Sequence, residues 1–140
     1  MTRAEVSAIK EAALVEAARK AREHARAGQS NFKVGAALLT KDGKVYTGCN
    51  VENATYALTV CAERTALLKA LSEGEPEDNF AMIAVVASPD DPTPPCGPCR
   101  QLLWEYCHDI PVVMANMTRT TKTLNLAELL PLPFDGRLLK

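Results

Sequence analysis

Apolar residues recur along the chain at two different spacings, which predict its helices and strands. Between residues 5 and 27, Ala, Val and Ile stand three and four positions apart among Glu, Lys and Arg, a pattern typical of an amphipathic helix that ends near Gly28. Two short apolar runs, 34–40 and 45–50, flank a turn that contains Asp-Gly, and this arrangement indicates a β-hairpin.

The second half of the chain continues the alternation of helical and strand-like segments. A run rich in Val and Ile between turn residues is typical of a buried strand, and a proline-rich loop separates it from the next helix. The predicted elements are a helix from Thr59 or Val60 to Ser72, a strand at 81–88, a loop at 89–98, a helix from Gly97 or Pro98 to Cys107, strands at 111–115 and 122–125, and a short helix at 126–130.

The order α-β-β-α-β-α-β-β-α favours an α/β protein with one sheet and helices packed on its faces. The length of 140 residues suits one domain with a core of its own, and no repeat or linker divides the chain. We therefore expect a single domain over residues 1–140.

Composition and charge exclude several classes of partner. A net charge of −1 and an aromatic content of 5% disfavour nucleic acid, because neither a basic field nor a stacking surface is indicated. No apolar run approaches the roughly 20 residues that span a bilayer, and the charged, Ala-rich start lacks the features of a signal peptide. We expect a cytoplasmic protein, not bound to a membrane, whose five cysteines stay reduced.

The strongest chemical signal is a set of three cysteines with a nearby glutamate. Cys61 stands two residues before Glu63, and Cys96 and Cys99 form a Cys-Gly-Pro-Cys motif further along the chain. Each motif lies where a predicted helix begins, and the helix dipole there favours the thiolate form that binds metal. Three thiolates would hold one zinc ion and leave its fourth tetrahedral position open, with the Glu63 carboxylate close enough to move protons.

Two arginines directly follow these motifs, Arg64 after the first and Arg100 after the second. Three thiolates on Zn²⁺ leave a centre with a net charge of about −1, which weakens its ability to acidify a bound water. We expect at least one of the arginines to donate hydrogen bonds to the sulfurs and to draw off that charge. Glu63 also has a purely structural interpretation, because an acid in the first turn of a helix stabilises its dipole.

Two other interpretations of the cysteines remain. Cys-Gly-Pro-Cys at the start of a helix is also typical of thiol–disulfide oxidoreductases, although a redox pair has no use for Cys61 and Glu63. A purely structural zinc site would need a fourth ligand, and the only histidines are His24 in the first helix and His108, nine residues past Cys99.

Several segments together carry a family resemblance. They are CAERTA at 61–66, PCGPCRQ at 95–101, FKVGAAL at 32–38, TGCNVENA at 47–54, and ELLP at 128–131 with Phe134 behind it. In this order they resemble the small, three-cysteine cytidine deaminases. The resemblance implies a three-layer α-β-α fold with a mixed five-stranded sheet and helices on both faces. It also implies the zinc-dependent hydrolysis of cytidine and 2′-deoxycytidine to the uridines and ammonia, in pyrimidine salvage.

The same resemblance assigns roles to individual residues. Cys61, Cys96 and Cys99 would hold one zinc ion per chain, and Glu63 would be the catalytic proton carrier. The remaining assignments concern a pyrimidine nucleoside as substrate: Asn50 and Glu52 would hydrogen-bond the ribose, Ala62 would meet the base edge through its backbone, and Phe32 would pack against the ring.

The resemblance further implies a homotetramer with shared active sites, in which Tyr56 and Phe134 reach a neighbouring subunit. The chain departs from the family in two places. Gln29-Ser30 stands where Tyr-Ser is usual, and residues 135–140 replace an acidic tail. Both regions lie near the mouth of the pocket in the family, so a deaminase of a related or modified aminopyrimidine nucleoside stays an alternative.

Overall fold

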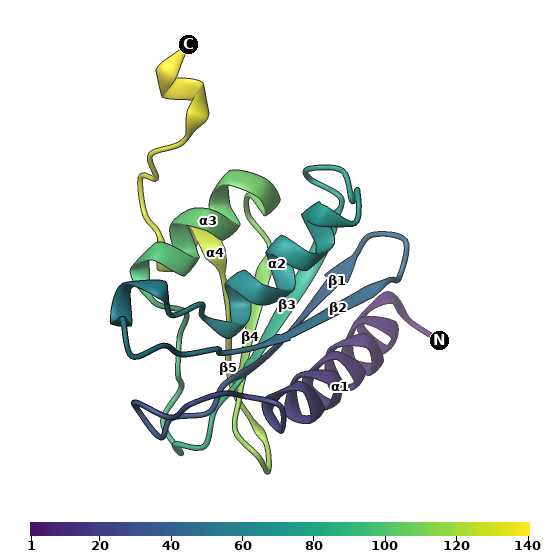
Figure 1. The fold of residues 1–140 in the computed structure, drawn as a ribbon. Coiled ribbons are helices and arrows are strands. Elements are labelled where there is room, and N and C mark those ends of the chain that lie inside the picture. The colour runs from purple at the N-terminus through teal and green to yellow at the C-terminus, as the bar shows by residue number, and fades with distance from the viewer.

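A five-stranded mixed sheet forms the middle layer of the molecule (Figure 1). The computed structural model describes all residues from Met1 to Lys140. The strands follow the spatial order β2-β1-β3-β4-β5, and β3 and β4 are the parallel pair while the other neighbours are antiparallel. Their bounds are β1 Gly35–Thr40, β2 Val45–Cys49, β3 Phe80–Val86, β4 Pro111–Ala115 and β5 Thr120–Asn125.

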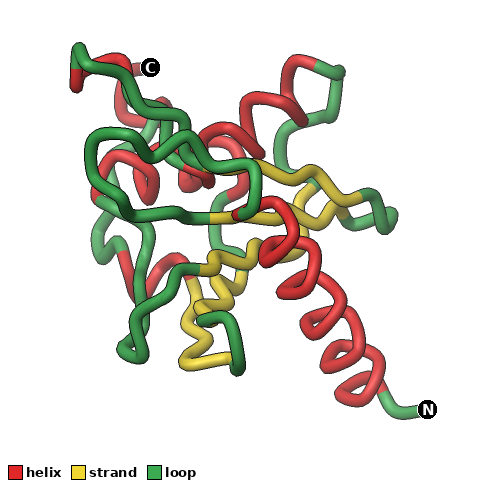
Figure 2. The backbone as a smooth tube through the Cα atoms, turned by 60° about the horizontal axis from the view of Figure 1, so that its bottom comes forward, coloured by secondary structure: helices red, strands yellow, loops and turns green.

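Helices cover both faces of this sheet. The bounds are α1 Arg3–Arg22, α2 Ala62–Ser72, α3 Gly97–Cys107 and α4 Leu126–Leu129, with single 3₁₀ turns at Tyr56–Leu58 and Gly136–Leu139. Figure 2 shows the strands lying between the long N-terminal helix and the other helices. The predicted α/β architecture of three layers is confirmed. None of the helices is both long and apolar enough to cross a lipid bilayer.

The core divides into two parts because alternate side chains of a strand point to opposite faces. Ala36 and Leu38 of β1 join the cluster under α2 and α3. Ala37 and Leu39 join the cluster under α1. All six residues of β1 are buried, which agrees with its place inside the sheet and with its continuous apolar sequence.

Two glycines allow helices to approach the sheet closely. A Cβ atom on Gly48 of β2 would lie 2.5 Å from the carbonyl oxygen of Ala62 and 2.5 Å from the amide nitrogen of Ala66 in α2. A Cβ atom on Gly35 of β1 would lie 2.0 Å from the carbonyl oxygen of Ala18 in α1. The first turn of α2, which follows Cys61, therefore rests directly on the backbone of β2.

Two helix ends differ from the prediction, in both cases because backbone groups pair with distant segments. The first helix stops at Arg22 rather than near residue 27, since the Arg26 amide donates to Asn50 (2.8 Å) and its carbonyl accepts from Glu52 (2.9 Å). The second begins at Ala62 rather than at residue 59 or 60, since Val60 forms an antiparallel bridge with Val51. Tertiary hydrogen bonds outweigh local helix propensity at both places.

The C-terminal tail is fastened along α3. Gln101 Nε2 donates to the Phe134 carbonyl (2.6 Å), and the Trp104 indole donates to Asp135 (3.0 Å). Asp135 is 3% exposed and also pairs with Arg137, so the tail is anchored by a buried carboxylate. Beyond this anchor the last residues extend away from the body of the molecule (Figure 1).

Candidate active site

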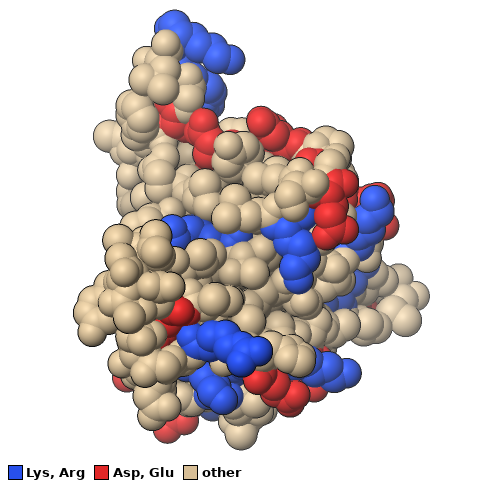
Figure 3. All heavy atoms as spheres, viewed as in Figure 1, with Lys and Arg blue, Asp and Glu red and all other residues tan.

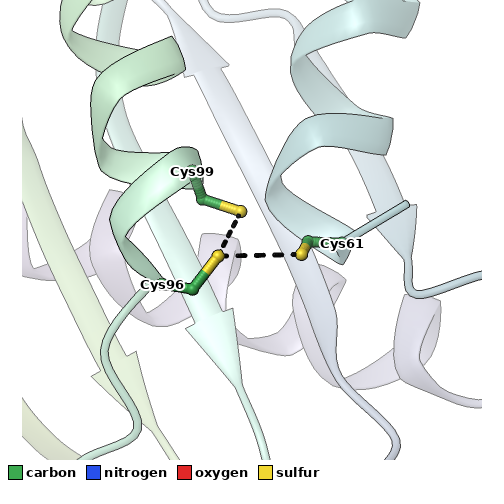
Figure 4. A group of neighbouring side chains, drawn as sticks. All are labelled: Cys61, Cys96 and Cys99. Atoms are coloured by element: carbon green, nitrogen blue, oxygen red, sulfur yellow. Dashed lines mark hydrogen bonds between the residues drawn. The ribbon is translucent and has the colours of Figure 1, made fainter. Parts of the chain in front are cut away.

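The starts of α2 and α3 bring three thiols together. Cys61 and Cys96 are the N-cap residues of these helices, and Cys99 lies in the first turn of α3. The Sγ atoms of Cys61 and Cys96 are 3.8 Å apart, those of Cys96 and Cys99 are 3.2 Å apart, and all three lie within 4.8 Å of one another. Figure 4 shows the three sulfurs pointing toward a common centre from the two helices.

This group fits one tetrahedral zinc ion. Sulfur atoms about 2.3 Å from a tetrahedral zinc lie about 3.8 Å from one another, close to the spacing found here. The group contains no histidine or carboxylate as a fourth ligand, so one position of the metal faces away from the three sulfurs. Protein sites that keep such a position open are the catalytic ones.

The charges around the sulfurs favour a metal-binding thiolate at Cys61. The Cys99 thiol lowers the pKa of Cys61 to about 5, and Arg64 contributes in the same direction. Arg64 Nη2 lies 3.6 Å from Cys61 Sγ and donates to the Thr59 carbonyl at 2.9 Å. The hydrogen bond of Cys99 to the Cys61 sulfur, together with burial, raises the pKa of Cys99 in turn, so the first proton leaves from Cys61.

Glu63 lies in the first turn of α2, close behind Cys61 in the sequence and in space. Its side chain is 5% exposed, and burial raises its pKa to about 7. It lines the same cavity as Cys61 and Cys96. A buried carboxyl group with a pKa near neutrality can both accept and return a proton under ordinary conditions.

The cavity in front of the three thiols has a volume of about 240 Å³, which suits a small molecule rather than a polymer. Phe32, Asn50, Glu52 and Ala62, to which the family resemblance assigns substrate contacts, all line it. Asn50 is held on three sides: Oδ1 accepts from the Val34 amide (2.9 Å), and Nδ2 donates to the Phe32 carbonyl (2.8 Å) and to Glu52 (3.2 Å).

Three of the residues singled out from the sequence lie elsewhere. Tyr56 is 76% exposed and borders a shallow hollow beside Glu52. Phe134 is 55% exposed and lies in the tail over α3. Arg100 donates to the carbonyls of Pro95 (2.7 Å) and Leu129 (2.8 Å) rather than to a sulfur, so it braces the loop that precedes Cys96.

Six further residues line the cavity that reasoning from the sequence did not single out as site residues, and two of them are the apolar Val34 and Val85. Ser30 and Thr59 come from loops on one side, and Thr93 and Pro94 come from the proline-rich loop before Cys96. The sequence predicts that loop only as a connection between a strand and a helix. Its position immediately before the Cys-Gly-Pro-Cys motif is the one signal that could have identified it as part of the cavity wall.

The arrangement joins a metal site, a buried proton carrier and polar side chains within one cavity. Cys61, Cys96 and Glu63 line its metal end, with the Cys99 sulfur within 4.8 Å of the other two sulfurs, and Asn50 and Glu52 supply polar groups to the same cavity. Hydrolysis of a small polar molecule at the metal end is the chemistry that these groups can perform together.

Comparison with known proteins gives the same picture over nearly the whole chain. The family model described as the zinc-binding region of cytidine and deoxycytidylate deaminases matches residues 8–115. A protein named cytidine deaminase from Sporosarcina psychrophila is 46% identical over 123 residues, covering 87% of this chain and 89% of that protein. A cytidine deaminase from Halalkalibacterium halodurans is 50% identical over 124 residues, covering 88% and 92%.

A solved structure agrees in fold as well as in sequence. The crystal structure of cytidine deaminase from Burkholderia pseudomallei superimposes with a TM-score of 0.85 at 50% identity, covering 96% of this chain and all of that one. With the three thiols placed for one zinc ion, these similarities show that the chain belongs to the cytidine and deoxycytidylate deaminase family of zinc-binding proteins.

Proposed function

We propose that the chain, as a single domain over residues 1–140, hydrolyses cytidine and 2′-deoxycytidine to uridine and 2′-deoxyuridine with release of ammonia. The observation that carries this proposal is the shared cavity: Cys61 and Cys96 line it together with Glu63, and Glu52 lines it as well. The names of the relatives support cytidine as a substrate.

Each side chain has a role that follows from its place. Cys61, Cys96 and Cys99 hold the zinc ion, which supplies Lewis-acid activation of water when it is bound. Glu63 would take one proton from the attacking water and give it to the pyrimidine ring, then take the remaining proton of that water from the hydroxyl added to the ring and give it to the leaving amine. Its burial keeps bulk water from competing for these protons.

The remaining contacts orient the nucleoside. Glu52 and Asn50 lie where sugar hydroxyls can bond to them, and Phe32 offers an apolar surface to the pyrimidine ring. Ala62 lines the cavity at the start of α2, and because its side chain is a methyl group, only its backbone can hydrogen-bond the base edge. These residues bring the amino-bearing carbon of the base toward the metal end of the cavity.

The test is an ultraviolet assay on both nucleosides, with and without a chelator, together with Glu63→Gln. We expect turnover that is lost on chelation and restored by zinc. Glu63→Gln should keep about one zinc per chain while kcat falls by ~10²–10⁴-fold, because a proton carrier is removed. Glu73→Gln, at the exposed end of the same helix, is the matched control. Full activity in Glu63→Gln would remove Glu63 from the mechanism.

The same experiment separates the alternatives. A protein that binds no zinc and reduces disulfides through Cys96 and Cys99 would be a thiol–disulfide oxidoreductase. Turnover of a modified aminopyrimidine nucleoside without turnover of cytidine would change the substrate. A polynucleotide is disfavoured, since basic and acidic side chains are interspersed on the face shown in Figure 3. Binding of single-stranded DNA at low salt would contradict that.

We further propose a homotetramer whose subunits complete one another's active sites. Tyr56 and Phe134 support this, because both aromatic side chains are largely exposed and neither lines the cavity of its own chain. Native mass by light scattering should correspond to four chains, and Phe134→Ala should raise KM or lower that mass without changing zinc content. A monomer with unchanged kinetics in Phe134→Ala would refute the shared site.

A cytoplasmic role in pyrimidine salvage completes the proposal. None of the five cysteines forms a disulfide, and three of them must stay reduced to hold zinc, which suits a reducing compartment. Cell fractionation with an antibody against the chain would test the location. Growth of a pyrimidine-requiring host on cytidine, dependent on this chain, would test the role.

A further inference from the structure

The loop that precedes β1 donates several hydrogen bonds to the carboxylate of Glu52. Its Oε1 accepts from the amides of Gln29 (3.0 Å) and Ser30 (2.8 Å), and its Oε2 accepts from the Ser30 hydroxyl (2.5 Å) and from Asn50 Nδ2 (3.2 Å). Ser30 alone supplies two of these four donors. Its hydroxyl oxygen also accepts from the Phe32 amide (3.0 Å), so it is fixed in turn by the chain two residues on.

These donors keep Glu52 ionised. The hydrogen bond from the Ser30 hydroxyl is the largest cause that lowers the pKa of Glu52, and the Ser30 and Gln29 amides add to it. An ionised carboxylate can only accept hydrogen bonds, so a ligand group that meets Glu52 must bring a donor. A sugar hydroxyl does so, whereas an ether, a fluorine or an ionised phosphate does not.

The four hydrogen bonds to Glu52 differ in length, and the longest is the one that a ligand can replace most easily. Asn50 Nδ2 makes the longest contact to Glu52, at 3.2 Å, while the three contacts from residues 29 and 30 are all shorter. A hydroxyl group that enters between Asn50 and Glu52 can accept from Nδ2 and donate to Oε2. Asn50 and Glu52 then each exchange one hydrogen bond for another, and the hydrogen bonds from residues 29 and 30 to Glu52 remain.

We propose that Ser30 is the positioning residue for sugar recognition, holding the Glu52 carboxylate so that one ligand hydroxyl can enter between Asn50 and Glu52. This inference rests on the proposed nucleoside deamination. It also accounts for the departure at Gln29: the contact to Glu52 comes from the backbone of that residue, so its side chain is free to differ.

A merely structural role for Ser30 gives a different expectation. Its bond with the Phe32 amide is a common turn contact, and losing that contact alone would lower thermal stability without changing the choice of substrate. The readout must therefore compare a nucleoside that carries the sugar hydroxyls with one that lacks them. Cytidine and 2′,3′-dideoxycytidine form such a pair, because they share the same base.

The experiment measures kcat and KM of the zinc-loaded protein for both nucleosides. In Ser30→Ala we expect KM for cytidine to rise about 10-fold with kcat within about twofold, since a hydrogen bond to a charged group is lost. Dideoxycytidine should be affected little, so the ratio of the two kcat/KM values should fall about 10-fold. Binding of the product uridine, measured by calorimetry, should weaken by the same factor.

Three further variants sharpen the result. Ser30→Thr keeps the hydroxyl and should restore the wild-type ratio. Ser30→Cys keeps an atom that fills the turn but donates weakly, so it should give an intermediate ratio even if Ser30→Ala folds poorly. In a Glu52→Gln background, Ser30→Ala should change the ratio of the two kcat/KM values little further, because the carboxylate that Ser30 positions is no longer present. Ser7→Ala, on the exposed surface of α1, is the matched control.

The outcomes are distinguishable. A lower melting temperature with an unchanged ratio in Ser30→Ala would overturn the inference and leave Ser30 as a turn residue. A wild-type chain that does not distinguish cytidine from dideoxycytidine would overturn it as well, while the proposed deamination would stand. A wild-type chain that deaminates neither nucleoside would refute the proposed function itself.

Discussion

Replacing Gly48 by alanine tests how closely the metal-bearing helix rests on the sheet. A Cβ atom there would lie 2.5 Å from the Ala62 carbonyl oxygen and from the Ala66 amide nitrogen, whereas ordinary contact begins near 3.4 Å. These two atoms stand at the acceptor and donor positions of an i, i+4 pair in the first turns of α2. The helix start would have to move by about 0.9 Å, and Cys61 and Glu63 would move with it.

We expect Gly48→Ala to lower the stability of the fold, whereas local strand propensity alone would predict an increase. Gly48 has no left-handed backbone, so propensity alone predicts that alanine stabilises the strand by about 0.5–1 kcal/mol. Overpacking typically costs ~1–3 kcal/mol and here outweighs that gain. We expect the melting temperature to fall by roughly 5–10 °C. Because a misplacement of about 1 Å can cost ~10²-fold in rate, kcat on cytidine should fall by a similar factor.

The assay combines calorimetric melting with the ultraviolet assay, and two other glycines serve as comparisons. Gly28→Ala should change neither quantity much, because no atom lies within 4 Å of the added Cβ. Gly35→Ala should lower the melting temperature while sparing kcat per folded molecule, because its clash is with α1 on the opposite face. A melting temperature for Gly48→Ala at or above that of the wild type would refute the close approach.

Two more predictions concern charge. Arg64→Gln should leave about one zinc per chain, since the three thiols remain. The acid limb of the pH profile of kcat should move to higher pH, because the negative charge of the sulfurs is no longer drawn off by the guanidinium group. An identical pH profile would exclude this role of Arg64. Hydrogen bonds from Tyr46 (2.7 Å) and Asn79 (2.9 Å) lower the pKa of Glu75 below its ordinary 4.5. A lowered pKa stabilises the folded state above the unfolded value and loses that effect as the pH falls through the folded value. The melting temperature of the wild type should therefore decline more steeply than that of Glu75→Gln as the pH falls below 4.5, and parallel curves would contradict the pKa shift.

The sequence revealed those parts of the fold that depend on neighbours in the chain. The long periodic helix, the hairpin around Asp42-Gly43 and both cysteine motifs are local patterns, and each was found close to its predicted place. The ends of α1 and α2 were misjudged because they depend on Arg26 and Val60, whose backbone partners lie far away in the sequence. Propensity carries no information about such partners.

The candidate site likewise combines residues that local sequence patterns predict with residues that only the folded chain brings together. Chemistry and spacing singled out the three cysteines and Glu63, whereas only a family resemblance singled out Asn50 and Glu52. Ser30 and Thr93 were missed because each stands in an irregular loop, and only the folded sheet brings these loops to one cavity. An Arg next to a cysteine motif was also ambiguous: Arg64 lies near Cys61, while Arg100 bonds to two carbonyl groups.

The sulfur cluster also ties together two distant parts of the polypeptide. Cys61 and Cys96 belong to different helices, with a whole strand between them in the sequence. An ion that grips both acts as a cross-link, and the free energy of metal capture becomes part of the free energy of folding. Affinity for the ion and resistance to denaturation are thus linked quantities. Mutations that loosen the packing of α2 far from the cavity will weaken metal retention well before they unfold the protein.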